Sequence, residues 1–427
     1  MAISRHRLYR LVLFGILAGV TASCTVLLFR WGIEHSQELF LPDHRIGNYE
    51  ALSPWIRLAL CVSGGFLLGL VMDLFPRPTH EVGIAHLLGY MTTNRTSRLP
   101  VANLAMQFLS GMFAIATGQS VDREGPGVHI GGASSSTIGR LFHASENEHY
   151  VLTACGGAAA IAAAFNTPLA GVVFVIEVLR MRYGVDRFMP VVLAAVIGAV
   201  GSRIVYGPHP AFIVPPLDMA SLWELPLVAI LGISTGLLST LFIGLTGWFA
   251  RRAAAWNATT AFTLAGTITG LLALAAPEIM GISYDTLDKM MQGRIVAGSL
   301  VLVLSAKLLA TSISIGLRVP GGLIGPTFVL GGALGGIGYF LAMAWYPANA
   351  GSPGFYSMIG MVAMMGATLR APLAALTASL ELTANPNIIL PGMIAVISAD
   401  FISSVVFGRQ TVFDALRSAM PSDEAGA

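Results

Sequence analysis

Residues 120–132, SVDREGPGVHIGG, place three adjacent charged side chains in an otherwise apolar part of the chain. Asp122, Arg123 and Glu124 follow a long, mostly apolar run, although only 11% of all residues are charged. Pro126 comes shortly after them, and proline suits the first turn of a helix, where its missing amide hydrogen has no partner anyway. Glycines on both sides of the proline let the chain turn sharply. The stretch therefore predicts a helix that begins next to charged side chains inside an apolar region.

A helix start of this kind attracts anions. Its first amide groups lack partners and together carry about half a positive charge, so an anion is their natural ligand. The chain repeats the pattern, since residues 125–132 are GPGVHIGG and residues 325–332 are GPTFVLGG. We expect the two helix starts to meet around one anion near the middle of a membrane.

Glu124 is the residue that we expect to gate this path. Its carboxylate is itself an anion, so the ionised form would occupy the site and the protonated form would swing away. Acidic residues inside membranes are functional candidates for this reason. The alternative is that Glu124 only caps the helix and pairs with Arg123.

The elements that would position these residues are membrane helices. The chain has 427 residues, of which 55% are hydrophobic, and its uncharged runs are long enough, or nearly so, to cross about 30 Å of hydrocarbon. A cleaved signal peptide is the alternative for the first run, but its length and the apolar runs that follow favour a membrane helix. Arginines before it predict a cytoplasmic N-terminus. The runs are 11–29, 58–72, 99–121, 225–249, 258–276 and 322–346.

A second repeated segment predicts two related halves. FNTPLAGVVFVIE ends at Glu177 and LRAPLAALTASLE ends at Glu381, and both have a glutamate nine positions after the proline. The order is the same as for the glycine-proline pair, and the offset of 204 residues is close to the 200 residues of that pair. We therefore predict one transmembrane domain, 1–427, made of halves at about 1–200 and 201–420, with the substrate site between the halves as in many transporters.

Other classes of function find little support. No phosphate-binding loop, dinucleotide fingerprint or zinc-protease motif is present, and no nucleophile–base or metal-ligand spacing suggests an intramembrane enzyme. We predict no enzyme activity, no cofactor and no metal. The net charge of +2 neither suggests nor excludes nucleic acid, and no nucleic-acid partner is expected.

From about residue 55 onward the chain resembles the CLC family of chloride channels and chloride/proton antiporters, of the prokaryotic type without an appended regulatory domain. The segment at 122–126 matches the family's G-R-E-G-P motif except at Asp122, and the one at 321–326 matches G-x-F-x-P with Ile324 in place of phenylalanine. The segments that carry the resemblance are DREGP (122–126), AAAFNTPLAGVVFVIE (162–177), GGLIGP (321–326) and LRAPLAALTASLELT (369–383).

The resemblance implies an all-α polytopic fold of two inverted halves with tilted and broken helices, and a homodimer with one anion path in each subunit. It places the protein in a lipid bilayer, as a multi-pass protein of the bacterial inner (plasma) membrane. It makes Glu124 the gating and proton-carrying residue facing the extracellular side. The anion-binding residues that it implies are Val82, Arg123, Glu124, Gly125, Gly322, Leu323, Ile324 and Phe413.

The family's first anion motif, G-S-G-I-P, is replaced here by PTHEVGIA (78–85). Val82 falls at the serine position and has no hydroxyl, while Thr79 would supply one only if the alignment shifts by three residues. His80 and Glu81 are additional polar groups. They either line the inner vestibule, where an imidazole can carry protons, or cap a short helix.

Five further positions bear on proton coupling and ion binding. Phe413 stands where antiporters usually have a tyrosine, so we expect weaker central binding. Val178 replaces a second glutamate that takes up cytoplasmic protons in many antiporters, and we expect Glu177 beside it to serve packing or pairing. Lys307 either approaches the ion path or snorkels or pairs with a helix. We expect His129 to be a satisfied helix residue.

Retention of Glu124 favours chloride transport coupled to counter-moving protons. A passive chloride channel in which Glu124 only gates, and a fluoride/proton antiporter, remain as alternatives.

Overall fold

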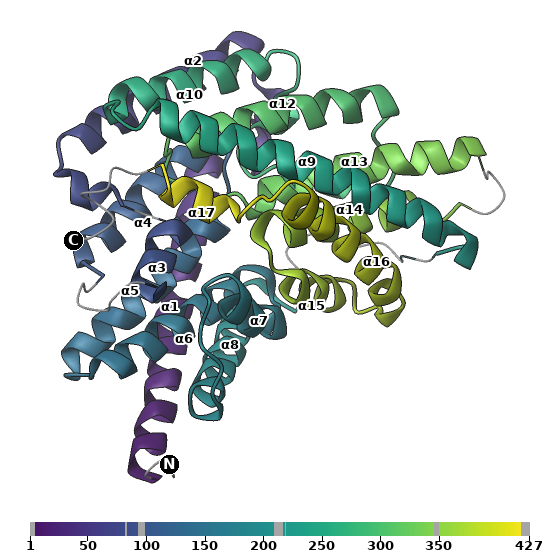
Figure 1. Cartoon of the computed structure of the whole chain (residues 1–427). Helices are drawn as coiled ribbons and strands as arrows, with labels where there is room; N and C mark the ends of the chain where they lie inside the picture. Colours follow the sequence, from purple (N-terminus) through teal and green to yellow (C-terminus); the bar gives the residue numbers. More distant parts are fainter. Residues whose placement is uncertain are drawn as a thin grey trace.

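The computed structural model describes residues 5–81, 83–92, 99–208, 217, 219–345 and 350–419. Their regular structure is helical, as expected, and Figure 1 shows the helices packed around a central region where the C-terminal helix also lies. The α-helices are α1 (Arg5–Phe40), α2 (Pro54–Asp73), α3 (Gly83–Thr92), α4 (Val101–Ala116), α5 (Glu124–Leu141), α6 (Glu146–Phe165), α7 (Pro168–Glu177), α8 (Val185–Tyr206), α9 (Leu225–Arg252), α10 (Ala258–Leu272), α11 (Tyr284–Met291), α12 (Ala297–Gly316), α13 (Ile324–Trp345), α14 (Pro353–Leu369), α15 (Pro372–Thr383), α16 (Ile389–Asp400) and α17 (Val412–Arg417).

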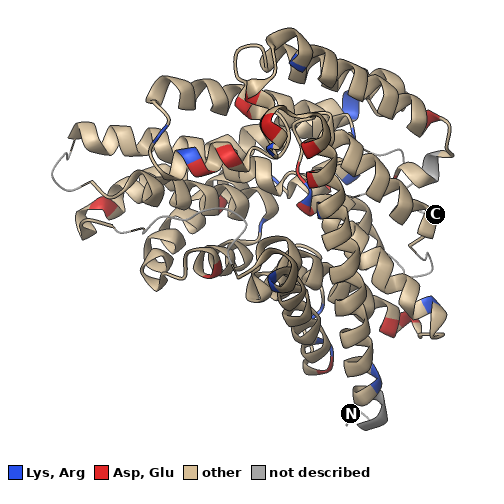
Figure 2. Ribbon diagram, turned by 180° about the vertical axis from the view of Figure 1, so that it is seen from behind, with Lys and Arg blue, Asp and Glu red and all other residues tan. Residues whose placement is uncertain are grey.

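The helices confirm a multi-pass membrane protein. Among the described residues, seven helices are long and apolar enough to cross a bilayer. In Figure 2, long stretches of helix carry no charged residue. Many large apolar side chains are exposed on these helices, among them Leu28 on α1 and Leu237 on α9. Such surfaces are stable in lipid rather than in water.

The first apolar run forms α1, which packs against α5, α6 and α8. Its buried face includes Phe14, Ala18, Ala22 and Phe29, each less than 5% exposed. A segment that supplies core side chains over its whole length belongs to the folded protein, so the structure supports the membrane-helix interpretation over that of a cleaved signal peptide.

The packing of the first eight helices recurs in the next eight. The pairs α5–α6, α6–α7, α6–α8 and α1–α8 have counterparts in α13–α14, α14–α15, α14–α16 and α9–α16. In Figure 1, α1 and α3–α8 gather in one part of the molecule, and α9 and α13–α16 in another. Between the first eight helices and the next eight, the most extensive contact is that of α2 with α10.

Two glutamates of the second repeated segment cap each other's helices. Glu177, at the end of α7, accepts hydrogen bonds from the amides of Leu373 (3.2 Å) and Ala374 (2.7 Å) at the start of α15. Glu381, in α15, accepts from Leu169 (2.9 Å) and Ala170 (2.8 Å) at the start of α7. Each carboxylate therefore satisfies amides that a helix leaves unpaired. The expected pairing role of Glu177 is confirmed.

Candidate anion site

The two glycine-proline segments meet, as the repeat predicts. Asp122, just before α5, and Gly322, just before α13, exchange backbone hydrogen bonds of 3.0 and 2.9 Å in an isolated antiparallel bridge. Gly125 faces Gly322 so closely that a Cβ atom on Gly125 would lie 2.6 Å from the Gly322 Cα. Only glycine permits this approach. The amino ends of α5 and α13, one from each predicted half, are thereby held together.

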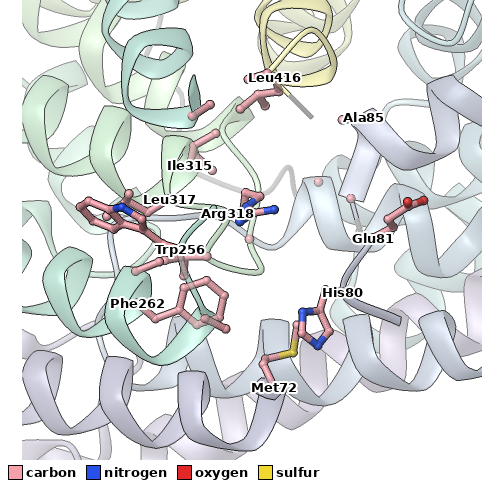
Figure 3. Close-up of a pocket in the computed structure, with 18 of the residues that line it drawn as sticks. Met72, His80, Glu81, Ala85, Trp256, Phe262, Ile315, Leu317, Arg318 and Leu416 are labelled. Carbon is pink, nitrogen blue, oxygen red and sulfur yellow. The ribbon is translucent and has the colours of Figure 1, made fainter. Parts of the chain in front are cut away.

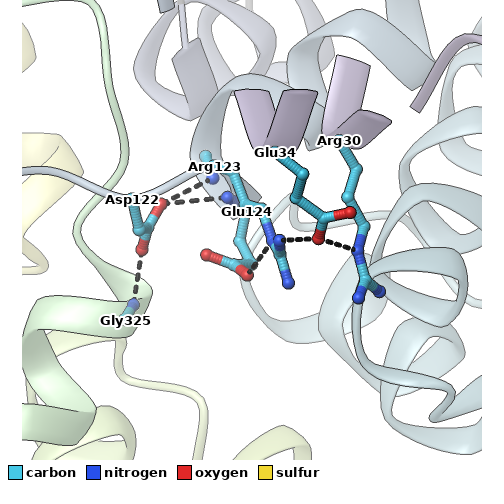
Figure 4. Close-up of polar contacts among 7 residues, drawn as sticks. Arg30, Glu34, Asp122, Arg123, Glu124 and Gly325 are labelled. Carbon is cyan, nitrogen blue, oxygen red and sulfur yellow. Dashed lines mark hydrogen bonds and ion pairs between the residues drawn. The ribbon is translucent and has the colours of Figure 1, made fainter. Parts of the chain in front are cut away.

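The side chain between these helix starts is that of Asp122 (Figure 4). Its Oδ1 accepts hydrogen bonds from the amides of Glu124 (3.0 Å) and Gly125 (3.1 Å), and its Oδ2 accepts one from the amide of Gly325. Asp122 is fully buried. No local sequence pattern predicts this cap, because one of its three amides comes from Gly325, 203 residues away.

Glu124 is the first residue of α5, and its side chain is fully buried. Neither carboxylate oxygen accepts a hydrogen bond that meets ordinary geometry among the described residues. The nearest charge is that of Arg123, whose Nε lies 3.4 Å from Oε1, and the Tyr284 side chain interacts electrostatically with the carboxylate. Glu124 pairs with Arg123, as the alternative interpretation held, but it does not cap the helix.

Arg123 has a second and closer partner that the sequence did not reveal. Its Nη1 donates to Glu34 Oε1 of α1 at 3.0 Å, and Arg30 Nε donates to the same oxygen at 2.7 Å. Arg30 also stacks over the Tyr206 ring, 3.5 Å from its centroid. Figure 4 shows the resulting row of alternating charges from Glu124 to Arg30. This row fixes Arg123 and leaves Glu124 as its least constrained member.

A cavity of about 250 Å³ reaches the helix starts. Several water molecules fit in such a volume. Of the expected anion-binding residues, it brings together Gly125, Gly322, Leu323 and Phe413. The amides of Leu323 and Ile324 make no hydrogen bond within the described part of the chain, so they remain available to a ligand.

Three expected residues are placed differently from these. Ile324 is fully buried as the first residue of α13, and Arg123 and Glu124 are not part of the cavity wall. Val82 lies outside the described residues. The Thr79 hydroxyl donates to the Pro76 carbonyl (2.7 Å), and Thr79 is not among the described residues of the cavity wall.

His80 and Glu81 line the cavity, which supports the first of the two interpretations left open for them (Figure 3). Glu81 begins a run of titratable groups. Its Oε2 lies 3.4 Å from His86 Nε2, and His86 Nδ1 lies 3.1 Å from Nε2 of His129. His129 is fully buried on α5, and its Nδ1 has no hydrogen-bond partner among the described residues. His129 was expected to be a satisfied helix residue, and this is half right, because Nε2 has a partner and Nδ1 has none within the described part of the chain.

Lys307 does not snorkel. Its buried Nζ donates to the carbonyls of Ile279 (2.9 Å) and Gly281 (3.0 Å) and to the Ser283 hydroxyl (2.9 Å). These contacts attach α12 to the segment that precedes α11. Lys307 also attracts Asp122 electrostatically, although it does not line the cavity. Val178 is buried at the end of α7 and offers no titratable group.

Residues 64–404 match the voltage gated chloride channel family. This match covers well over half of the chain, so the protein belongs to the CLC family. The members of this family are named as channels and transporters. The predicted family is confirmed.

Three individual proteins illustrate the relationship. The H(+)/Cl(-) exchange transporter ClcA of Vibrio cholerae is 32% identical over 327 residues, which are 73% of this chain and 69% of the relative. A slow cyanobacterial Cl-/H+ antiporter has a similar structure, with a TM-score of 0.80, 22% identity, and coverage of 99% of this chain and 100% of that chain. A CLC-type fluoride/proton antiporter superposes with a TM-score of 0.78 at 18% identity, covering 97% of this chain and 99% of that chain. These structural likenesses confirm the CLC-type fold alone.

Proposed function

We propose that this protein exchanges chloride for protons across a bacterial plasma membrane, with Glu124 as the gate and proton carrier. The observation that carries the proposal is the meeting of two helix starts beside the buried carboxylate of Glu124, at the end of a cavity that anions can enter. The name of the Vibrio relative favours chloride and proton exchange over the channel and fluoride alternatives.

The course of α1 supports an outward-facing gate. The arginines near the start of α1 predict that this end is cytoplasmic, and one of them, Arg10, pairs at 3.1 Å with Glu148 in the first turn of α6, the helix that follows α5. Glu34, further along α1, contacts Arg123 just before the start of α5. The 24 helical steps from Arg10 to Glu34 span about 36 Å, which exceeds the hydrocarbon thickness of about 30 Å. We therefore place Glu124 toward the extracellular side.

In this proposal, anions enter from the cytoplasm through the cavity. The amides of Leu323 and Ile324 hold a chloride ion there, close to Phe413. When Glu124 is ionised, its negative charge repels an approaching anion. Protonation removes that charge, which links anion passage to proton binding.

Protons need a separate cytoplasmic route because Val178 cannot carry them. We assign this role to Glu81, His86 and His129, which run from the cavity wall to α5. About 7.5 Å of helix axis separates His129 from Glu124, so water molecules must complete the path. Imidazoles suit such a relay because one ring nitrogen can accept a proton while the other releases one.

The proposal includes two further elements. The division into halves at about 1–200 and 201–420 is supported by the recurring helix contacts and by the reciprocal caps of Glu177 and Glu381. The homodimer rests on the family resemblance, and the molar mass of the purified protein in detergent tests it.

The replacement Glu124→Gln tests the gate. We expect proton flux in liposomes to fall to the level of protein-free vesicles while chloride flux continues. Glu177→Gln is the matched control, because it makes the same replacement at a glutamate that caps a helix and takes no part in the proposed gate. This variant should keep the wild-type ratio of protons to chloride. Proton coupling that persists in Glu124→Gln would remove Glu124 from the mechanism.

A further inference from the structure

The Asp122 carboxylate has the surroundings of a bound anion. Three amides from the amino ends of two helices donate to its two oxygens, and the side chain is closed off from solvent. Each helix end adds a partial positive charge, and Lys307 adds attraction from α12. One carboxylate thus occupies a position where converging amides would otherwise bind a free anion.

The neighbouring Glu124 points to the same conclusion independently. Its buried carboxylate lies beside these helix starts, yet its oxygens accept no hydrogen bond of ordinary geometry among the described residues. The amides of Glu124 and Gly125, which lie nearest to it along the chain, are already engaged by Asp122 Oδ1. A second anion therefore cannot use these two amides.

The space around the carboxylate is also fully used. A Cβ atom on Gly322 would lie 1.8 Å from Asp122 Oδ1, so the carboxylate fills the gap that the glycine leaves. Gly125 and Gly322 both line the cavity, which gives an ion access once the carboxylate is removed. Chloride is similar in size to a carboxylate group and could then take its place.

We infer that Asp122 is a tethered anion that competes with the transported anion for the amides of Glu124, Gly125 and Gly325. This inference rests on the proposed function, because it adds a second anion position to the path, next to the one at the amides of Leu323 and Ile324. It assigns to the aspartate that replaces the motif's glycine a role in setting how many anions the protein holds. The wild-type protein binds chloride at the amides of Leu323 and Ile324 only.

The test compares Asp122→Ala with the wild-type protein in chloride-free gluconate buffer. We expect the variant to melt at a lower temperature without chloride, since three amides lose their acceptor. Added chloride should raise its melting temperature in a saturable manner and more than it does for the wild type, because a ligand that binds only the folded state stabilises it. Calorimetry should find one more bound chloride per chain in the variant.

Glu381→Ala is the matched control. The Glu381 carboxylate also accepts from two amides at a helix start, those of Leu169 (2.9 Å) and Ala170 (2.8 Å), but it serves one helix only and lies outside the cavity wall. Its removal should lower the melting temperature without a chloride response beyond that of the wild type.

Asp122→Asn provides a second measurement if the alanine variant does not fold, because it keeps the shape and removes the charge. We expect chloride to bind this variant about fivefold more tightly than the wild type, because the negative charge that repels an anion is gone. A fivefold change corresponds to a free-energy difference of RT ln 5. The inference is overturned if neither variant binds chloride more tightly or in greater number, which would make Asp122 a helix cap like Glu381. Melting temperature and calorimetry both measure chloride binding, not proton movement. A wild-type protein that conducts chloride without moving protons would therefore contradict the proposed exchange but would not affect the test of Asp122.

Discussion

Replacing Phe413 with tyrosine should tighten the binding of chloride at the amides of Leu323 and Ile324. Phe413 is buried, only 4% exposed, yet its ring lines the cavity together with Gly322 and Leu323. The new hydroxyl would extend from the ring toward a cavity of about 250 Å³, which has room for it. It would add a hydrogen-bond donor near the amides of Leu323 and Ile324.

The size of the effect follows from the energy of one hydrogen bond. A bond to a charged group contributes about 1.5–3 kcal/mol, from which the loss of the hydroxyl's bond to water must be subtracted. We expect a net gain of about 1.4 kcal/mol, which is a tenfold lower dissociation constant. Calorimetry of the purified protein with chloride measures it directly.

Phe262→Tyr provides the matched control for this measurement. Phe262 is a buried phenylalanine that lines the same cavity from α10, and we assign it no contact with the anion. Its variant should bind chloride as the wild type does. Equal affinities for Phe413→Tyr and the wild type, or equal gains in both variants, would refute the placement of Phe413 beside the bound ion.

Two further predictions concern the proton route and the reciprocal caps. His86→Phe should lower the number of protons moved per chloride, because it interrupts the contacts of His86 with Glu81 and His129; an unchanged ratio in liposomes would remove this route. Glu177→Gln and Glu381→Gln should each lower the free energy of unfolding in detergent by about 1–2 kcal/mol, because each weakens two bonds at a helix start. Unequal or absent losses would contradict an equivalent role in the two halves.

Much of the fold could be predicted because the relevant signals are local. Uncharged runs marked the membrane helices, and the glycine-proline segments marked α5 and α13. The repeats placed Glu177 and Glu381 in corresponding positions, although their exchange of caps became visible only in the structure.

The partners of the site could not be predicted, because they come from distant parts of the chain. Glu34 meets Arg123 across 89 residues, and His86 meets His129 across 43. Neither pair has a spacing that marks it in the sequence. The role of Asp122 is absent from the sequence pattern for a related reason. Its role depends on the amide of Gly325, which only the packing of α13 against α5 brings near.

The most direct test of the central proposal is a flux measurement on the wild-type protein reconstituted into liposomes. A chloride gradient is imposed while external pH and chloride are recorded together. Proton–chloride exchange predicts that chloride drives protons uphill against their own gradient, by a route that bypasses Val178. Chloride flux without any proton movement would contradict it and make the protein a channel in which Glu124 only gates.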